Sequence, residues 1–143
     1  MGQIGKKERE TQDRVIALFR DVLKYDYLGN WEDCINSNVD EELLTAWLEK
    51  QGVDQNLINK ALYEFTKATN SQGNLYYTNK EVYNLLRYGV TVQPEIGQNK
   101  TTVWLIDWKN PLNNHFAIAE EVTVVGQHTK RPDIVLYVNG IAL

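Results

Sequence analysis

The chain has 143 residues, of which 43% are hydrophobic and 24% are charged, and its net charge is −4. These values are ordinary for a globular protein, and the length suits a single domain with one sizeable core. The acidic balance argues against an isolated high-affinity nucleic-acid binder, which usually carries a basic stripe, but it does not exclude a nuclease whose catalytic carboxylates add negative charge.

The cysteine content and the lack of long apolar runs bear on the cell compartment. Cys34 is the single cysteine and cannot form an internal disulfide, which favours a reducing compartment. No signal peptide is recognisable, and no stretch approaches the roughly 20 apolar residues of a membrane-spanning helix. The sequence therefore predicts a cytoplasmic protein that does not contact a membrane.

The first part of the chain, residues 1–89, is predicted to be mainly helical. Apolar residues recur at helical spacing, and Asp, Asn and Gly stand where helices commonly begin and end. Residues 27–30 and the polar cluster 69–74 have the composition of turns and loops. The predicted helices run from Lys7 to about Tyr25, from Asn38 or Asp40 to Gly52, from Asp54 to about Ala68, and from Thr78 or Asn79 to Gly89.

After Gly89 the hydrophobic period changes to two, so residues 90–143 are predicted to be mainly strands. The predicted strands are Val90–Val92, Thr101–Trp108, Phe116–Val125 and Ile134–Val138. Helices followed by consecutive strands with short connections indicate an α+β fold, in which N-terminal helices pack on a mostly antiparallel sheet. We expect one domain over residues 1–143.

The last segment, "KRPDIVLYVNGIAL" (130–143), ends in an unusual place. Its strand runs into Asn139-Gly140, the strongest short-range signal for a two-residue hairpin turn. The chain then stops three residues into the returning arm, on bare aliphatic side chains. We therefore expect the sequence to be a piece of a longer polypeptide.

The sequence lacks the residue patterns of several common functional sites. There is no Gly-rich phosphate loop with a Lys-Ser/Thr pair, so this segment is not expected to bind ATP. No cysteines or histidines are paired at zinc spacing. The two histidines, His115 and His128, are interpreted as surface or turn residues because nothing nearby completes a catalytic group.

Asp133 is the informative residue. It opens a strand, follows Lys130, Arg131 and Pro132, and precedes an Asn-Gly turn. A Pro-Asp pair before a strand is common turn chemistry by itself. The whole segment, however, resembles the first half of the hairpin of PD-(D/E)xK nucleases, in which an Asp opens one strand and a Glu-x-Lys pair lies on the returning strand. Carboxylate oxygens suit Mg²⁺, which polarises a phosphate and activates a water, and a lysine offsets developing charge.

Nearly the whole chain resembles the amino-terminal domain of the motor-and-cleavage (R) subunit of type I restriction enzymes. The similar stretches are "ETQDRVIALF" (10–19), "YDYLGNWED" (25–33), "NKEVYNLLRYGV" (79–90), "TVWLIDWKNPLNNHFAIAEEVTV" (102–124) and "KRPDIVLYVNGIAL" (130–143). The last two are the most specific.

This resemblance implies a restriction-endonuclease-like core that is incomplete here, because the Glu-x-Lys pair would fall beyond Leu143. It implies Mg²⁺-dependent cleavage of double-stranded DNA, coupled to ATP-driven translocation in the full-length complex. Methyltransferase and specificity subunits would be partners, and ATP and S-adenosylmethionine would serve other parts of the complex. The 143-residue piece itself is expected to be inactive.

Five further residues are candidates for the site, each with a plainer alternative. Glu8 matches best the acid that related nucleases place on the first helix toward the metal, although acids are also favoured there by the helix dipole. Lys130 and Arg131 are candidates for contacts to the DNA backbone, or for a solvated turn. One of Glu120 and Glu121 should point inward if the strand alternates, as a site carboxylate or as an edge-strand charge.

The aromatic residues and the helical block leave alternatives open. Tyr25, Tyr27 and Trp31, or Tyr76, Tyr77 and Tyr83, could stack on bases, but packing in the core is the favoured interpretation. A different class of function is a non-catalytic module in which residues 31–68 dock partner subunits. A third is a DNA-binding scaffold without sequence preference.

Overall fold

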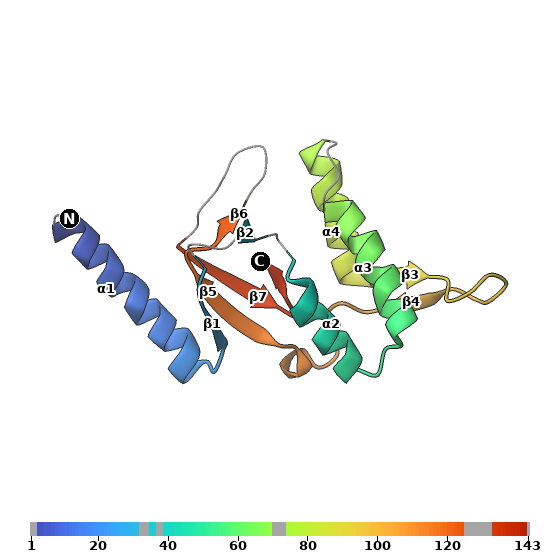
Figure 1. Ribbon diagram of the computed structural model, residues 1–143, viewed down its shortest axis with the longest axis horizontal. Helices are drawn as coiled ribbons and strands as arrows, with labels where there is room; N and C mark the ends of the chain where they lie inside the picture. Colours follow the sequence, from blue (N-terminus) through green and yellow to red (C-terminus); the bar gives the residue numbers. More distant parts are fainter. Residues whose placement is uncertain (1–2, 32–34, 37–38, 70–73, 125–132, 143) are drawn as a thin grey trace. The chain divides into compact units, whose positions relative to one another are not determined.

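The computed structural model describes residues 3–31, 35–36, 39–69, 74–124 and 133–142 (Figure 1). The chain divides into two compact units, and we call them unit 1 (Met1–Asn38 and Phe116–Leu143) and unit 2 (Val39–His115). Unit 2 is thus inserted in sequence between two segments of unit 1. The predicted α+β class with mostly antiparallel strand pairing is confirmed.

The main sheet belongs to unit 1 and has the strand order β1-β5-β7-β8. Strand β5 is parallel to β1 and antiparallel to β7, which in turn is antiparallel to β8. A short parallel pair, β2 with β6, completes the unit. The strands are β1 (Asp26–Asn30), β2 (Ile35–Asn36), β5 (Phe116–Glu120), β6 (Thr123–Val124), β7 (Ile134–Val138) and β8 (Ile141–Ala142).

The core of unit 1 is built on the central strand β5. Four of its five residues are buried, as its run of small and β-branched side chains predicts for a strand covered on both faces. Ala117, Ala119, Val122 and Tyr137 form a buried cluster, and the ring of Trp31 lies 5.7 Å from that of Tyr137.

The predicted hairpin is confirmed. Asn139 and Gly140 have φ angles of 51° and 82°, as a type I′ turn requires at both central positions. The turn sets the register, in which Tyr137 pairs with Ala142 and Val138 with Ile141.

The first helix is also confirmed, as α1 (Gln3–Ala17) followed by a π-helical turn, η1 (Leu18–Val22). The predicted turn at residues 27–30 is wrong, because these residues form most of strand β1. Parallel pairing with β5 overrides the local turn composition, and Gly29, at φ 105°, lies where the register shifts.

In its described residues, unit 2 contains three α-helices, a short 3-10 helix η2 (Pro111–Asn113) and a two-stranded antiparallel sheet. The predicted second and third helices are confirmed, and the Asp40 side chain caps the second by accepting a hydrogen bond from the Leu43 N–H (3.2 Å). Leu44, Leu48, Ile58 and Phe65 are fully buried and form its core. The elements are α2 (Glu41–Lys50), α3 (Gln55–Thr69), α4 (Leu75–Tyr88), β3 (Val90–Val92) and β4 (Thr101–Val103).

Helix α4 begins earlier than predicted. Asn74, assigned from the sequence to a loop, is its N-cap and accepts a hydrogen bond from the Tyr76 N–H (2.8 Å). The predicted end at Gly89 is confirmed. Gly89 has φ 82°, and a Cβ there would lie 2.6 Å from Cγ2 of Thr102, so a side chain would clash as well as strain the backbone.

The strand predicted over residues 101–108 is too long, since β4 ends at Val103. Asp107 instead organises a turn: its carboxylate accepts hydrogen bonds from the backbone N–H groups of Lys109 (3.1 Å) and Asn110 (2.9 Å) and from the Asn113 side chain (3.0 Å). The Asp107 N–H donates to Asn114 Oδ1 (2.8 Å). These local bonds compete successfully with a continued ladder.

We expect this turn to be sensitive to acid. The Asn110 N–H, and next the Asn113 amide, hold the pKa of Asp107 below its ordinary value of 3.8. A lowered folded-state pKa gives stability that is present above the unfolded-state pKa and is lost as the pH falls below about 4. Protection of the Asn110 amide against hydrogen exchange, measured relative to its intrinsic exchange rate at each pH, should therefore fall in acid more in the wild-type chain than in Asp107→Asn. Equal acid dependence of the two proteins would contradict this role.

Candidate functional site

The structure places Asp133 directly before β7, with its side chain exposed. Its backbone carbonyl accepts hydrogen bonds from the Glu121 N–H (2.9 Å) and from Gln12 Nε2 (3.4 Å). The main chain is thus held from α1 and from the end of β5. Among the described residues, no hydrogen bond or ion pair engages the Asp133 carboxylate, which is open to a ligand.

The structure also settles which glutamate of the pair points inward. Glu120 is only 3% exposed, and Arg9 Nη2 donates to its Oε2 at 3.2 Å. Glu121, at φ 53°, ends β5, so the strand predicted to reach Val125 stops at Glu120. The Glu121 Oε1 atom accepts a hydrogen bond from Gln12 Nε2 (3.2 Å).

The buried Glu120 carboxylate has two polar neighbours. Its hydrogen bond and its charge raise the pKa of Arg9, so the guanidinium stays protonated. Burial, and then the charge and hydrogen bond of Glu120, raise the pKa of Tyr27, which keeps its hydroxyl proton as a donor. Such partners are what a buried carboxylate requires. Glu120 therefore links the end of β5 to α1 through Arg9. The Asp133 carboxylate has no such partner among the described residues and can bind a ligand.

Glu8 forms no hydrogen bond or ion pair with Glu120, Glu121 or Asp133 among the described residues. It is exposed on α1, one residue before Arg9 and hence about 100° away around the helix. Arg9 and Gln12, which share the inward face of α1 with the buried Ile16, make the contacts instead. Neither residue was predicted from the sequence, although the i, i+3, i+7 spacing of Arg9, Gln12 and Ile16 was a usable signal.

The remaining candidates divide by location. Lys130, Arg131, His128 and Cys34 lie outside the described residues. His115 is partly buried in unit 2. Within the described residues, no group of three or more His, Cys, Asp or Glu side chains could hold a metal ion. Asp133 supplies one hard oxygen ligand of the kind that Mg²⁺ prefers, and a stable site would need further ligands.

The core interpretation holds for only part of the first aromatic group. Tyr25 packs against Phe19 and Phe116, with ring centroids 4.9 and 5.4 Å away, as predicted, whereas Tyr27 is 39% exposed and the interpretation is wrong for it. The core interpretation is wrong for Tyr76, Tyr77 and Tyr83 of α4, which are 67%, 67% and 60% exposed. These three remain available to a ligand.

The fold agrees with the class of protein that the sequence resembles. An α+β fold with an Asp directly before a hairpin strand is what the resemblance to the R subunit of type I restriction enzymes implied. The family model for the type I restriction enzyme R protein N terminus matches residues 5–143. The chain therefore belongs to this family. No curated protein and no solved structure matches it. None of the described helices is long and apolar enough to cross a membrane.

Proposed function

We propose that this chain contributes the Asp133 carboxylate to a Mg²⁺-dependent DNA cleavage site in a type I restriction enzyme. Membership of the R protein family supports a restriction role. The observation that carries the proposal is Asp133 itself, an exposed carboxylate at the start of a hairpin strand whose backbone is fixed by Gln12 and Glu121.

The residues around Asp133 would position it. Gln12 bonds to both the Asp133 carbonyl and the Glu121 carboxylate, and the Arg9–Glu120 pair anchors the same helix one turn away. Both links hold the first carboxylate of the site in a fixed place relative to β5. Mg²⁺ bound there would polarise a phosphodiester and lower the pKa of an attacking water.

The hairpin geometry suits a second half-site. The β7–β8 register pairs Val138 with Ile141 and Tyr137 with Ala142, so a returning strand that kept this register would run back past Asp133. A Glu and a Lys on that strand could then share a metal and a phosphate with Asp133. Glu8 is retained as a second candidate ligand, and Lys130 and Arg131 as contacts to the DNA backbone.

In the complete enzyme we propose that cleavage of double-stranded DNA is coupled to ATP-driven translocation. Methyltransferase and specificity subunits would be the partners. ATP would be used elsewhere in the complex, since this chain has no phosphate-binding loop. S-adenosylmethionine would likewise serve another part of the complex.

The 143-residue chain alone should not cleave DNA. Its sequence contains no Glu-x-Lys triplet, and a single carboxylate leaves Mg²⁺ mostly hydrated and weakly held. Supercoiled plasmid incubated with the purified chain and Mg²⁺ should stay intact. Nicking that survives repurification and disappears in Asp133→Ala would mean that this chain already holds a complete site.

A further inference from the structure

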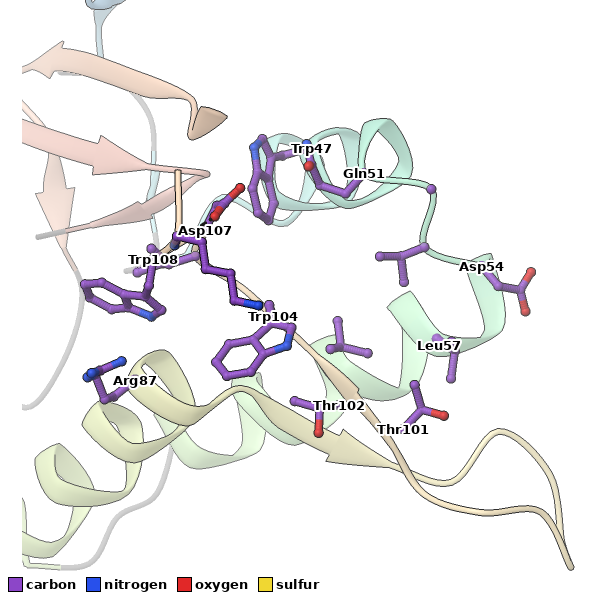
Figure 2. A pocket seen from close by; sticks show the side chains of 15 residues that line it. Trp47, Gln51, Asp54, Leu57, Arg87, Thr101, Thr102, Trp104, Asp107 and Trp108 are labelled. Atoms are coloured by element: carbon purple, nitrogen blue, oxygen red, sulfur yellow. Dashed lines mark hydrogen bonds between the residues drawn. The ribbon is translucent and has the colours of Figure 1, made fainter. Parts of the chain in front are cut away.

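Unit 2 contains a cavity of about 690 Å³, within the range of about 300–1,000 Å³ typical of ligand sites (Figure 2). Trp47, Trp104 and Trp108 line it, and the last two are 49% and 48% exposed. The Trp108 indole N–H donates to the Leu86 carbonyl (2.9 Å), and that of Trp47 to the Asn113 carbonyl (3.1 Å). These bonds fix both rings, so the cavity offers preformed aromatic walls.

Positive charge gathers at one side of this cavity. The Arg87 guanidinium lies 5.4 Å from the ring centroid of Trp108, and Lys109 also lines the wall. The Asp107 carboxylate is engaged by the three donors of its own turn. Figure 2 shows Asp54 at the end of the cavity away from Arg87. Asp107 keeps its negative charge and attracts Lys109, which leaves Arg87 as the cation of this wall that forms no ion pair among the described residues.

A second feature begins at Arg87 and follows α4. Tyr76, Lys80, Tyr83 and Arg87 are exposed and are spaced i, i+4, i+7, i+11, which places them in one line along the helix; we call them the α4 row. Tyrosines and cations alternate along it, and the two tyrosines are about 10 Å apart along the axis. Because Arg87 also lines the cavity, the row and the cavity form one continuous surface.

We propose that unit 2 binds single-stranded nucleic acid, with one base in the tryptophan cavity and the neighbouring nucleotides along the α4 row. Exposed indole and phenol faces stack on any base, and cations between them pair with the intervening phosphates. The Thr101 and Thr102 hydroxyls, which line the cavity, can meet the polar edge of a base.

The shape of the surface favours a single strand over other ligands. A base in a duplex is stacked on its neighbours and cannot enter a concave aromatic cavity without being unstacked. An apolar peptide would fill the cavity but would leave Lys80 and Arg87 without partners. The net charge of −4 argues against high-affinity binding, so we expect binding to be detectable at low salt and to depend on the few cations of this surface. The inference concerns unit 2 and does not depend on Asp133 of unit 1.

The cavity supplies its own reporter, because three of the four tryptophans of the chain line it. Titrating the wild-type chain at low salt with oligothymidylate of about 12 nucleotides, within the site sizes known for single-strand binders, should quench tryptophan emission. A hairpin duplex of the same nucleotide content should bind at least about tenfold more weakly, because its bases are stacked. No quenching, or equal affinity for the duplex, would overturn the proposal.

Variants locate the binding surface. In fluorescence anisotropy with labelled oligothymidylate, Trp104→Ala should weaken binding about five- to 100-fold, and Trp104→Phe should recover most of it, because stacking on one ring is the contribution removed. Replacing Lys80 and Arg87 together by Gln should lower the salt slope by about 0.7 for each lost phosphate contact.

Matched controls lie on α3. Tyr63 and Lys67 are exposed but belong neither to the cavity nor to the α4 row, so Tyr63→Ala and Lys67→Gln should bind like the wild type. Equal losses in Trp104→Ala and Tyr63→Ala would overturn the proposal. So would loss of subunit association in Trp104→Ala with unchanged oligothymidylate affinity, which would assign the cavity to a protein partner.

Discussion

Replacing Asp133 by Asn in the full-length R protein is expected to abolish DNA cleavage while ATP-driven translocation continues. The Asp133 side chain is exposed and takes part in no hydrogen bond among the described residues, so the substitution should change stability by less than about 0.5 kcal/mol. The amide keeps the shape of the carboxylate but removes the charge that holds Mg²⁺. Stabilisation by a metal ion contributes several kcal/mol to such reactions, so cleavage should fall about a thousandfold or more.

The measurement is a pair of assays on one preparation of the assembled complex, plasmid cleavage and translocation-dependent ATP hydrolysis. Asp21→Asn is the matched control, because Asp21 is an exposed acid of the same unit whose ion pair among the described residues is with its neighbour Arg20. It should cleave normally. Normal cleavage by Asp133→Asn would reduce Asp133 to a turn residue, and loss of both activities would indicate a defect in assembly.

Replacing Arg9 by Met is expected to destabilise unit 1 far more than replacing Arg20 by Met. Both arginine side chains are 49% exposed, and each pairs with an exposed acid, Arg9 with Asp13 (56%) and Arg20 with Asp21 (61%). Arg9 differs because it also pairs with Glu120, whose side chain is 4% exposed. Removing one partner of a fully buried pair costs about 3–5 kcal/mol, whereas an exposed pair contributes about 0–1 kcal/mol. Since Arg9 is half exposed, we expect a loss of about 1–3 kcal/mol for Arg9→Met and no measurable loss for Arg20→Met.

The ion-pair distances make this comparison informative. Arg9 and Arg20 each lie 2.9 Å from an exposed acid, Asp13 and Asp21, so the two arginines differ in the additional pair of Arg9 with the buried Glu120 at 3.2 Å. Hydrogen exchange of amides in β5 and β7 measures the stability of unit 1 directly. Adding Glu120→Gln to Arg9→Met should restore much of the loss, because the uncompensated charge is then gone. A double variant no more stable than Arg9→Met would show that packing of the arginine stem, and not its charge, is the cause.

Features with a local signal were predictable from the sequence. The Asp40 cap, the helix end at Gly89 and the turn at Asn139-Gly140 each depend on a few neighbouring residues, and the structure confirms all three. Asn74 had the same capping chemistry but was hidden in a polar cluster, so α4 was predicted too short. The family, too, was recognisable from quoted stretches of sequence.

Features that depend on distant residues were not predictable in this way. Strand β1 exists because β5 lies beside it, and its own composition indicates a turn. Strand alternation could not decide between Glu120 and Glu121, because β5 is buried on both faces and ends at a positive φ. Arg9 decides it, from the far end of the chain.

The sequence by itself determined the class of fold, the family and the position of Asp133 at the start of a hairpin. Each of these depends on short contiguous patterns: the hydrophobic period, the stretches similar to the family, and the Asn-Gly turn. Only the tertiary structure decided which acid is left free, since Arg9 and Gln12 engage Glu120 and Glu121 through contacts between α1 and the end of β5. Likewise Trp47, Trp104 and Arg87 belong to separate elements and meet only when unit 2 folds. A binding surface of that kind is set by packing between elements, which no local period encodes.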